Sequence, residues 1–281
     1  MRRMTRREHL LRQALLLLVG LFVVVPIWGI AYMAFDSSFF GRPSEFRVLP
    51  GEFSLDLFGR VFERAAQSLP FADLLRNSLN VAVGATAFSV ALGASMAYAF
   101  ARMRFPGRRV GLFALLAGSL MPPIALVIPL YLLLASLGIR TTQLGLMIVY
   151  AAIAMPFCVW NMRVAFQSVP RELEEAAFID GASFGIAFAR VTLPLALPAI
   201  GLAAFVAFLG AYSEFALGWM FVDRADNVTL AMGLWNAISL AGNDWNFMAA
   251  YALMMSVPVV VVFVLLQRYL VNGLLAGKVE L

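Results

Sequence analysis

The sequence predicts an all-α integral membrane protein with six transmembrane helices and a short cytoplasmic helix between the fourth and the fifth. Three observations support this class. The 281 residues are 62% hydrophobic and only 13% charged, the apolar residues gather in six long runs, and one acidic, alanine-rich segment interrupts those runs. A run of about 20 apolar residues can cross the roughly 30 Å hydrocarbon core of a bilayer as a helix. This composition excludes an ordinary soluble domain.

The apolar runs follow one another with short connections and leave no room for a separate soluble domain. We therefore expect one transmembrane domain over residues 1–281, with the bundle at 14–270 and cytoplasmic tails at 1–13 and 271–281. The expected spans are Ala14–Phe35, Asn77–Ala101, Val110–Ala135, Leu144–Met162, Thr192–Val222 and Met248–Leu270. The first apolar core, of about 22 residues, exceeds the roughly 7–15 of a cleavable signal peptide, so we expect a retained signal anchor.

Basic residues indicate the orientation of the spans. They gather before the first span, between the second and third, between the fourth and fifth, and after the sixth. By the positive-inside rule these four regions are cytoplasmic, which places both termini inside. The residues are Arg2, Arg3, Arg6, Arg7, Arg12, Arg102, Arg104, Arg108, Arg109, Arg163, Arg171, Arg190, Arg268 and Lys278. The net charge of +5 is thus a topology signal, and we expect no nucleic-acid partner.

Groups that could carry redox, metal or hydrolytic chemistry are scarce. Cys158 and His9 are the single cysteine and the single histidine, so neither an internal disulfide nor a His/Cys metal site can form. The sequence also lacks the G-x-x-x-x-G-K-[ST] phosphate loop, so the chain cannot hydrolyse ATP itself. We expect no catalytic residue, no metal and no cofactor in this chain.

The acidic segment after the fourth span, residues 168–190, is too short and too charged to cross a membrane. Pro170 suits the first turn of a helix there, and the glutamates that follow favour the positive end of its dipole. Gly181 can end this helix in a left-handed conformation, and Ser183 can start a second one. Membrane-surface helices are usually basic, so the excess of acids favours a protein partner with basic residues over lipid.

This segment resembles the EAA signature of the membrane subunits of ATP-binding-cassette importers. That signature is Glu-Ala-Ala, three residues, Gly, nine residues, Ile, one residue, Leu-Pro, and Val191 stands here where isoleucine is usual. The matching residues are Glu175, Ala176, Ala177, Gly181, Leu193 and Pro194. The resemblance extends from about Leu75 to the C-terminus and is nearest to the second permease of maltose-type sugar systems.

The resemblance implies a permease subunit that forms half of the translocation pathway of an ATP-driven carbohydrate importer in a bacterial inner membrane. The implied substrate is maltose, maltodextrin or a related disaccharide such as trehalose. The implied partners are a second permease subunit, a cytoplasmic ATPase dimer that binds ATP and Mg, and an extracytoplasmic sugar-binding protein. The segment would be a coupling helix, in which Glu175 pairs with a basic residue of the ATPase and Phe178 or Phe184 fills an apolar pocket there.

Three prolines in the third expected span predict a broken helix. Each of Pro122, Pro123 and Pro129 removes a backbone hydrogen bond, which a membrane protein tolerates where neighbours or a cavity satisfy the freed carbonyl. We therefore expect a bundle that can open and close around a central path.

Glu214 is the one carboxylate well inside an expected span, so it should face protein or water rather than lipid. Two roles stay open: it lines the sugar path, or it bonds one helix to another. Tyr212 and Trp219 lie nearby in the sequence and could stack on a sugar ring, although aromatic residues in a membrane span more often serve packing.

The connection after the fifth span, about Asp223 to Asn246, is long for a link between packed helices, and we expect a loop on the outer side. Two roles stay open for it. It reaches the sugar-binding protein, or its tryptophans anchor it at the membrane interface. The candidate contact residues are Trp235, Asn236, Gly242 and Asn243.

Two alternative functions also stay open. An ion-coupled secondary carrier would work alone, but such carriers usually need several intramembrane acids, and Glu214 is a single one. An ATP-binding-cassette importer of another solute would share the coupling segment but not the sugar.

Overall fold

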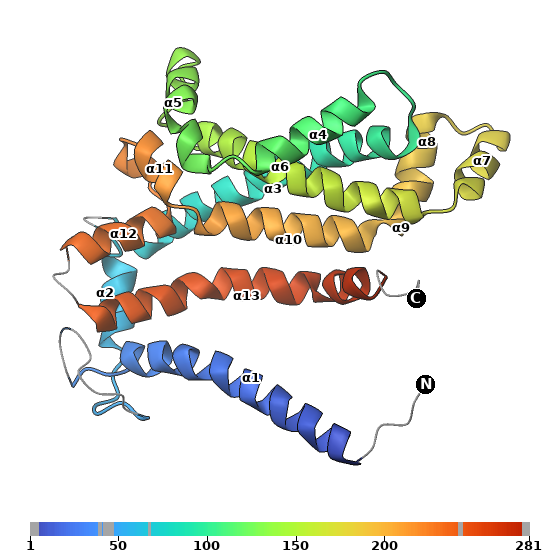
Figure 1. Cartoon of the computed structure of the whole chain (residues 1–281). Coiled ribbons are helices and arrows are strands. Elements are labelled where there is room, and N and C mark those ends of the chain that lie inside the picture. Colours follow the sequence, from blue (N-terminus) through green and yellow to red (C-terminus); the bar gives the residue numbers. More distant parts are fainter. Residues whose placement is uncertain (1–5, 39–40, 42–47, 67–68, 241–243, 277–281) are drawn as a thin grey trace. The chain divides into compact units, whose positions relative to one another are not determined.

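The computed structural model describes residues 6–38, 41, 48–66, 69–240 and 244–276, and helices dominate this part of the chain (Figure 1). Extended residues pair in two isolated bridges, Asp36 with Phe53 and Ala66 with Leu69. The predicted all-α class is confirmed. The four helices that are long and apolar enough to cross a membrane are α1 (Arg6–Ala34), α3 (Phe71–Arg102), α6 (Gln143–Ser168) and α13 (Trp245–Ala276). Two bent helix pairs raise the number of candidate spans to as many as six.

The first bent pair is the third expected span. It consists of α4 (Arg108–Ser119), the 3-10 helix η1 (Pro123–Leu126) and α5 (Val127–Ser136), and the chain bends by 102° between its two arms. Pro122 has an extended backbone, with φ −59° and ψ 126°, and neither it nor the next proline can donate a helical hydrogen bond. The predicted break in this span is confirmed.

The second bent pair belongs to the fifth expected span, Thr192–Val222, which is not a single helix. Its first arm contains α8 (Phe184–Ala187), the π-helix η2 (Phe188–Thr192) and α9 (Leu193–Leu195), and its second arm is α10 (Leu197–Ser213). The arms meet at 79°. Beyond Ser213 the helix breaks again before α11 (Ala216–Phe221).

The described chain divides into two compact units. The first comprises Met1–Phe71 with Leu234–Val257 and includes α1 and the short α2 (Asp56–Glu63). Within it, Asp36 accepts hydrogen bonds from the N–H groups of Ser38, Gly51 and Glu52. Burial would raise the pKa of this carboxyl, but hydrogen bonds from the Ser38 side chain and from the three N–H groups outweigh burial and lower the pKa to about 2.

The second unit comprises Ala72–Gly233 with Pro258–Leu281, and its core lies where α3, α6 and α10 pack (Figure 1). Small residues allow the close approach that membrane helices need. A Cβ atom on Gly93 of α3 would lie 3.0 Å from the Cβ of Cys158 on α6. The side chain of Asn161 on α6 donates a 2.7 Å hydrogen bond to the carbonyl of Ala199 on α10.

The connection after the fifth span is largely helical, so the predicted outer loop is wrong for its middle part. A 3-10 turn, η3 (Ala225–Asn227), precedes α12 (Leu230–Leu240). Leu230 and Met232 are fully buried, and the Leu230 N–H donates to the hydroxyl of Ser78 at 2.7 Å. This segment forms a helix because its apolar residues pack into a core. The Gly and Asn residues nearby in the sequence indicated a loop instead.

Candidate functional site

The acidic segment forms the helix α7 (Arg171–Ile179), with Pro170 immediately before its first residue. Gly181 ends it at φ +85°. The Gly181 N–H donates to the Phe178 carbonyl at 3.0 Å, and the Ala182 N–H donates to the Ala177 carbonyl at 2.9 Å. These two bonds are the Schellman termination that left-handed glycine permits. The hydroxyl of Ser183 then accepts from the Ile186 N–H and starts α8, so both sequence predictions are confirmed.

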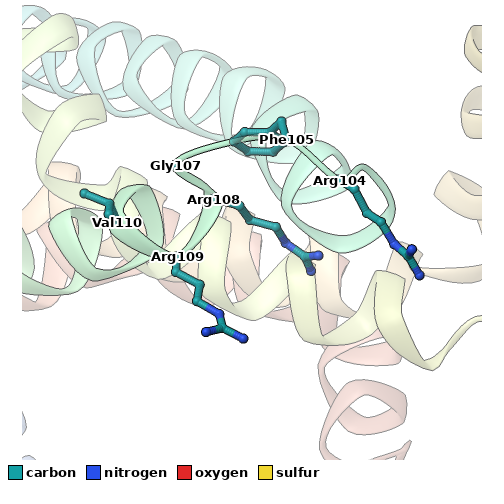
Figure 2. Close-up of a pocket in the computed structure, with 6 residues that line it drawn as sticks. All are labelled: Arg104, Phe105, Gly107, Arg108, Arg109 and Val110. Atoms are coloured by element: carbon teal, nitrogen blue, oxygen red, sulfur yellow. The ribbon is translucent and has the colours of Figure 1, made fainter.

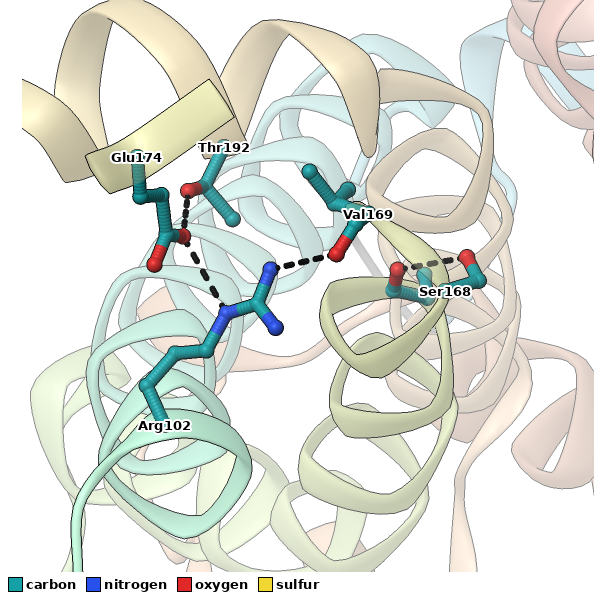
Figure 3. A network of polar contacts seen from close by, with 6 residues as sticks. Arg102, Ser168, Val169, Glu174 and Thr192 are labelled. Atoms are coloured by element: carbon teal, nitrogen blue, oxygen red, sulfur yellow. Dashed lines mark hydrogen bonds and ion pairs between the residues drawn. The ribbon is translucent and has the colours of Figure 1, made fainter. Parts of the chain in front are cut away.

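Neighbouring glutamates of α7 have opposite surroundings. Glu174 is 5% exposed, whereas Glu175 is exposed. Arg102, at the end of α3, donates from Nε to Oε1 of Glu174 at 3.1 Å and from Nη2 to the carbonyl of Val169 at 2.7 Å. The hydroxyl of Thr192 donates to the same Glu174 oxygen (Figure 3). Glu174 therefore attaches α7 to the end of α3 and to η2.

The outer side of the segment is both acidic and apolar. Ile179 is 87% exposed and Phe184 is also exposed. Phe178 is partly buried, and its ring lies 4.9 Å from that of Phe184 between centroids. The sequence indicated the two phenylalanines but not Ile179, although an isoleucine directly before Asp180 and the terminating glycine was a usable signal. A cavity of about 370 Å³ adjoins the segment and is lined by Tyr98, Arg102, Met103, Arg104, Arg171, Glu174, Glu175, Phe178 and Phe184.

Leu193 and Pro194 connect the segment to α10. The Leu193 N–H donates to the carbonyl of Phe188, five residues earlier, which is the π-helical spacing. Pro194 lacks an N–H and cannot donate to the carbonyl four residues before it, which disfavours a regular α-helical turn here.

Ala176 is exposed and Ala177 partly buried, so the surface of α7 carries little side-chain bulk at these positions.

Glu214 lies at the break between α10 and α11. One carboxylate oxygen accepts from the Leu217 N–H at 2.9 Å. The other accepts from the Gly218 N–H at 3.2 Å and from the Tyr150 hydroxyl at 2.7 Å. Glu214 therefore caps α11 and bonds it to α6. It also lines a cavity of about 230 Å³ with Tyr150, Ile153, Ala154, Phe157, Val206, Ala207, Gly210 and Ala211, so the structure is compatible with both roles left open by the sequence.

The structure does not bring the three candidate pathway residues to one surface. Tyr212 is 1% exposed and stacks on Phe208 with ring centroids 5.5 Å apart. Trp219 is exposed and lines a different cavity, of about 500 Å³, together with Val127, Ile128, Tyr131, Leu132 and Met220. In this conformation Tyr212 serves packing, while Trp219 and Glu214 face separate spaces.

The candidate contact residues of the outer connection are also separated. Trp235 is exposed and Asn236 is buried, both on α12. Gly242 and Asn243 lie outside the described residues. Over the described ranges, no group of three or more His, Cys, Asp or Glu residues is placed to hold a metal ion.

The fold and this geometry define a class: a helical protein with several candidate membrane spans and an exposed, acidic segment beside them. Residues 89–275 match the family described as "Binding-protein-dependent transport system inner membrane component". The chain belongs to this family, as the sequence resemblance predicted, and is an inner-membrane transport subunit.

Curated relatives agree with the family. The chain is 32% identical over 233 residues to the inner membrane ABC transporter permease protein YcjP of Escherichia coli, covering 83% of this chain and 82% of that one. It is 36% identical over 219 residues to the maltose/maltodextrin transport system permease protein MalG of Salmonella typhimurium, covering 75% and 74%. It is 31% identical over 236 residues to the trehalose transport system permease protein SugB of Mycobacterium tuberculosis, covering 83% and 85%.

A solved structure supports the fold. The chain aligns with a chain of a bacterial ABC transporter involved in the import of the acidic polysaccharide alginate, with a TM-score of 0.75 and 23% identity. The alignment covers 96% of this chain and all of that one.

Proposed function

We propose that this chain is a permease subunit of an ATP-binding-cassette sugar importer and forms half of its translocation pathway. The observation that carries the proposal is the two-sided helix α7. Its inner carboxylate, Glu174, is fixed to the bundle by Arg102 and Thr192, while Glu175 and Ile179 are exposed. An exposed apolar group beside a charge is the chemistry of a protein contact.

The proposed partners follow from the absence of a phosphate loop in the sequence and from the exposed side of α7. Without a phosphate loop it needs a separate ATPase dimer, which would bind ATP and Mg and receive α7. A second permease would complete the pathway. An extracytoplasmic sugar-binding protein would deliver the substrate; a structural neighbour of this chain comes from an alginate transporter in complex with a pentasaccharide-bound periplasmic protein.

The proposed substrate is an oligosaccharide of the maltose or trehalose kind. Relatives at 30% identity or more are named for maltose and maltodextrin, trehalose, α-glucosides and diacetylchitobiose. Glu214 with its cavity, and Trp219 with the separate cavity that it lines, are the two candidate surfaces for the sugar path in this subunit. Trp235, Asn236, Gly242 and Asn243 stay candidates for contact with the sugar-binding protein.

The mechanism depends on a rigid link between α7 and the bundle. A displacement of α7 would be transmitted to α3 through the ion pair between Glu174 and Arg102. It would be transmitted to η2 through the hydrogen bond from Thr192 to Glu174. Charge-assisted hydrogen bonds between buried groups are stronger than neutral ones and hold their geometry. ATPase motion would thereby move the ends of α3 and α10 together.

The proposed topology has six spans, each bent pair counting as one, with both termini and α7 in the cytoplasm. The arginines near α7 and at the α3–α4 turn support this orientation. A reporter fused after Lys278 should be active only in a cytoplasmic form, and one inserted near Gly51 only in an external form. The opposite pattern would contradict the topology.

A charge reversal on α7 tests the proposal. Glu175→Lys should reduce sugar-stimulated ATPase activity and uptake in proteoliposomes at least ten-fold, because a like charge would face the basic residue of the ATPase. Glu172→Lys is the matched control, since Glu172 is also exposed on α7 but lies outside the EAA pattern, and it should keep near-normal activity. Normal stimulated activity in Glu175→Lys, or uptake by the purified chain without any ATPase, would overturn the proposal.

A further inference from the structure

The turn between α3 and α4 encloses a cavity of about 370 Å³ lined by Arg104, Phe105, Gly107, Arg108, Arg109 and Val110 (Figure 2). Gly107 adopts φ +82°, which reverses the chain so that Arg104 before it and the two arginines after it surround one space. Figure 2 shows the three arginine side chains extending to the same side of the turn. The lining contains three positive charges and no acidic residue.

The three arginines of this cavity form no ion pair among the described residues, as is also true of Arg171 and Arg190, and Arg104 also lines the neighbouring cavity that contains Glu174 and Glu175. Arg60, Arg102 and Arg140 each pair with an acidic side chain. Arg163 of α6 adds a further positive charge nearby: its Nε donates to the carbonyl of Phe100 at 3.4 Å, and the ring of Phe100 packs against that of Phe105. The cluster therefore carries positive charge that no ion pair with a described carboxylate neutralises.

The neighbouring surface identifies what kind of anion fits. None of the residues of α4 is fully buried. Leu112 and Leu115 pack against the core, whereas Phe113 is 70% and Leu116 44% exposed on the other side of the helix. In an inner-membrane protein such a face lies in lipid. The cavity lies at the first turn of this helix, next to the exposed Val110, where the apolar face gives way to charge. This is the depth of lipid headgroups.

We propose that this cavity binds the phosphate of an anionic phospholipid such as phosphatidylglycerol. The guanidinium groups of Arg104, Arg108 and Arg109 bind the phosphate oxygens, for which arginine has a matching planar set of donors. The acyl chains lie along Val110 and Phe113. The inference rests on the proposed insertion of α4 and α5 as one bent span, and is independent of the sugar. An acidic contact from a partner protein would use the same charges but not the apolar face.

The test measures lipid binding to the full-length chain, purified in detergent and stripped of lipid, by native mass spectrometry. Phosphatidylglycerol should bind at least ten-fold more tightly than phosphatidylcholine. A basic residue near an anionic surface contributes about five-fold in affinity, so replacing Arg104, Arg108 and Arg109 with Gln should weaken phosphatidylglycerol binding on the order of a hundred-fold. Arg108→Gln alone should weaken it about five-fold, and this milder variant guards against misfolding.

A control variant removes the same charge elsewhere. Arg6, Arg7 and Arg12 are exposed at the start of α1, also beside an apolar helix, and replacing all three with Gln should change binding less than two-fold. Equal losses in the two triple variants would overturn the site in favour of diffuse surface charge. Binding of free glycerol phosphate as tight as that of the lipid would overturn the lipid in favour of a soluble anion.

Two further outcomes are decisive. Release of bound phosphatidylglycerol when the ATPase assembles would overturn the lipid site in favour of a protein contact. Labelling of introduced cysteines reports separately whether α4 and α5 insert. An inserted chain that shows no preference for phosphatidylglycerol contradicts only this inference, while failure to insert contradicts the proposed function as well.

Discussion

Glu174 and Glu214 are both carboxylates in the apolar second unit, but the protein compensates them differently. Glu174 is paired with the full charge of Arg102 and with the hydroxyl of Thr192. Glu214 receives neutral donors, namely the hydroxyl of Tyr150 and two N–H groups of α11. The first arrangement fixes α7 to α3 and η2, and the second caps a helix break beside a cavity. Breaking the Glu174–Arg102 ion pair should therefore cost far more folding stability than removing the neutral contacts of Glu214.

The largest effect should follow Arg102→Met. It leaves Glu174 buried without a countercharge, and removing one partner of a buried pair costs about 3–5 kcal/mol. Both side chains are less than a tenth exposed, at 8% and 7%. The readout is thermal and denaturant stability of the purified chain in detergent. The double variant Arg102→Met with Glu174→Met should recover most of the loss, because no buried charge remains. A loss under 1 kcal/mol in the single variant would contradict the comparison.

A smaller effect should follow Glu214→Leu, which leaves the Tyr150 hydroxyl and the N–H groups of Leu217 and Gly218 without this acceptor. Unsatisfied buried donors cost about 1–3 kcal/mol, and the same stability measurements apply. Glu214→Gln keeps one acceptor oxygen and should lose roughly half as much. If Glu214→Leu proves as damaging as Arg102→Met, the contrast between charged and neutral compensation is wrong.

Gly181→Val tests the left-handed turn that ends α7. A Cβ atom at Gly181 would meet nothing within 4 Å, so any cost comes from the left-handed backbone, about 1–2 kcal/mol. Gly181→Asn tolerates that conformation and should cost less. Stability and assembly with the ATPase should both follow the order Gly, Asn, Val. An equal loss of assembly in both variants would show that the turn conformation is not the cause.

The smallest effect should follow Tyr150→Phe, which removes one neutral hydrogen bond worth about 1 kcal/mol. Glu214 keeps its two N–H donors from α11, so the break itself should persist. Tyr98→Phe is the control, since the Tyr98 ring packs in the same unit against Phe188. A stability loss above about 2 kcal/mol in Tyr150→Phe would mean that this hydroxyl, rather than the α11 cap, positions Glu214.

Local signals in the sequence predicted the features that depend on neighbouring residues. Gly181 and Ser183 marked the end and the start of two helices, and Pro122 with Pro123 marked the break in the third span. Glu174 was not predicted as an anchor, because its partner Arg102 lies 72 residues away, and pairing at that separation depends on how α3 and α7 pack. The break at Glu214 was missed because no proline precedes it, and the carboxylate itself replaces the lost helical bonds.

The π-helix η2 affects the direction in which the exposed side of α7 faces. An α-helix turns about 100° with each residue, and a π-helical turn accommodates one residue more than an α-helical one. Shortening Phe188–Thr192 by one residue would return it to regular spacing and swing everything before it by about 100° around the helix axis. The direction in which Glu175 and Ile179 face relative to α9 therefore depends on the number of residues in η2. A single-residue deletion there would turn these two side chains to a different direction without replacing either of them.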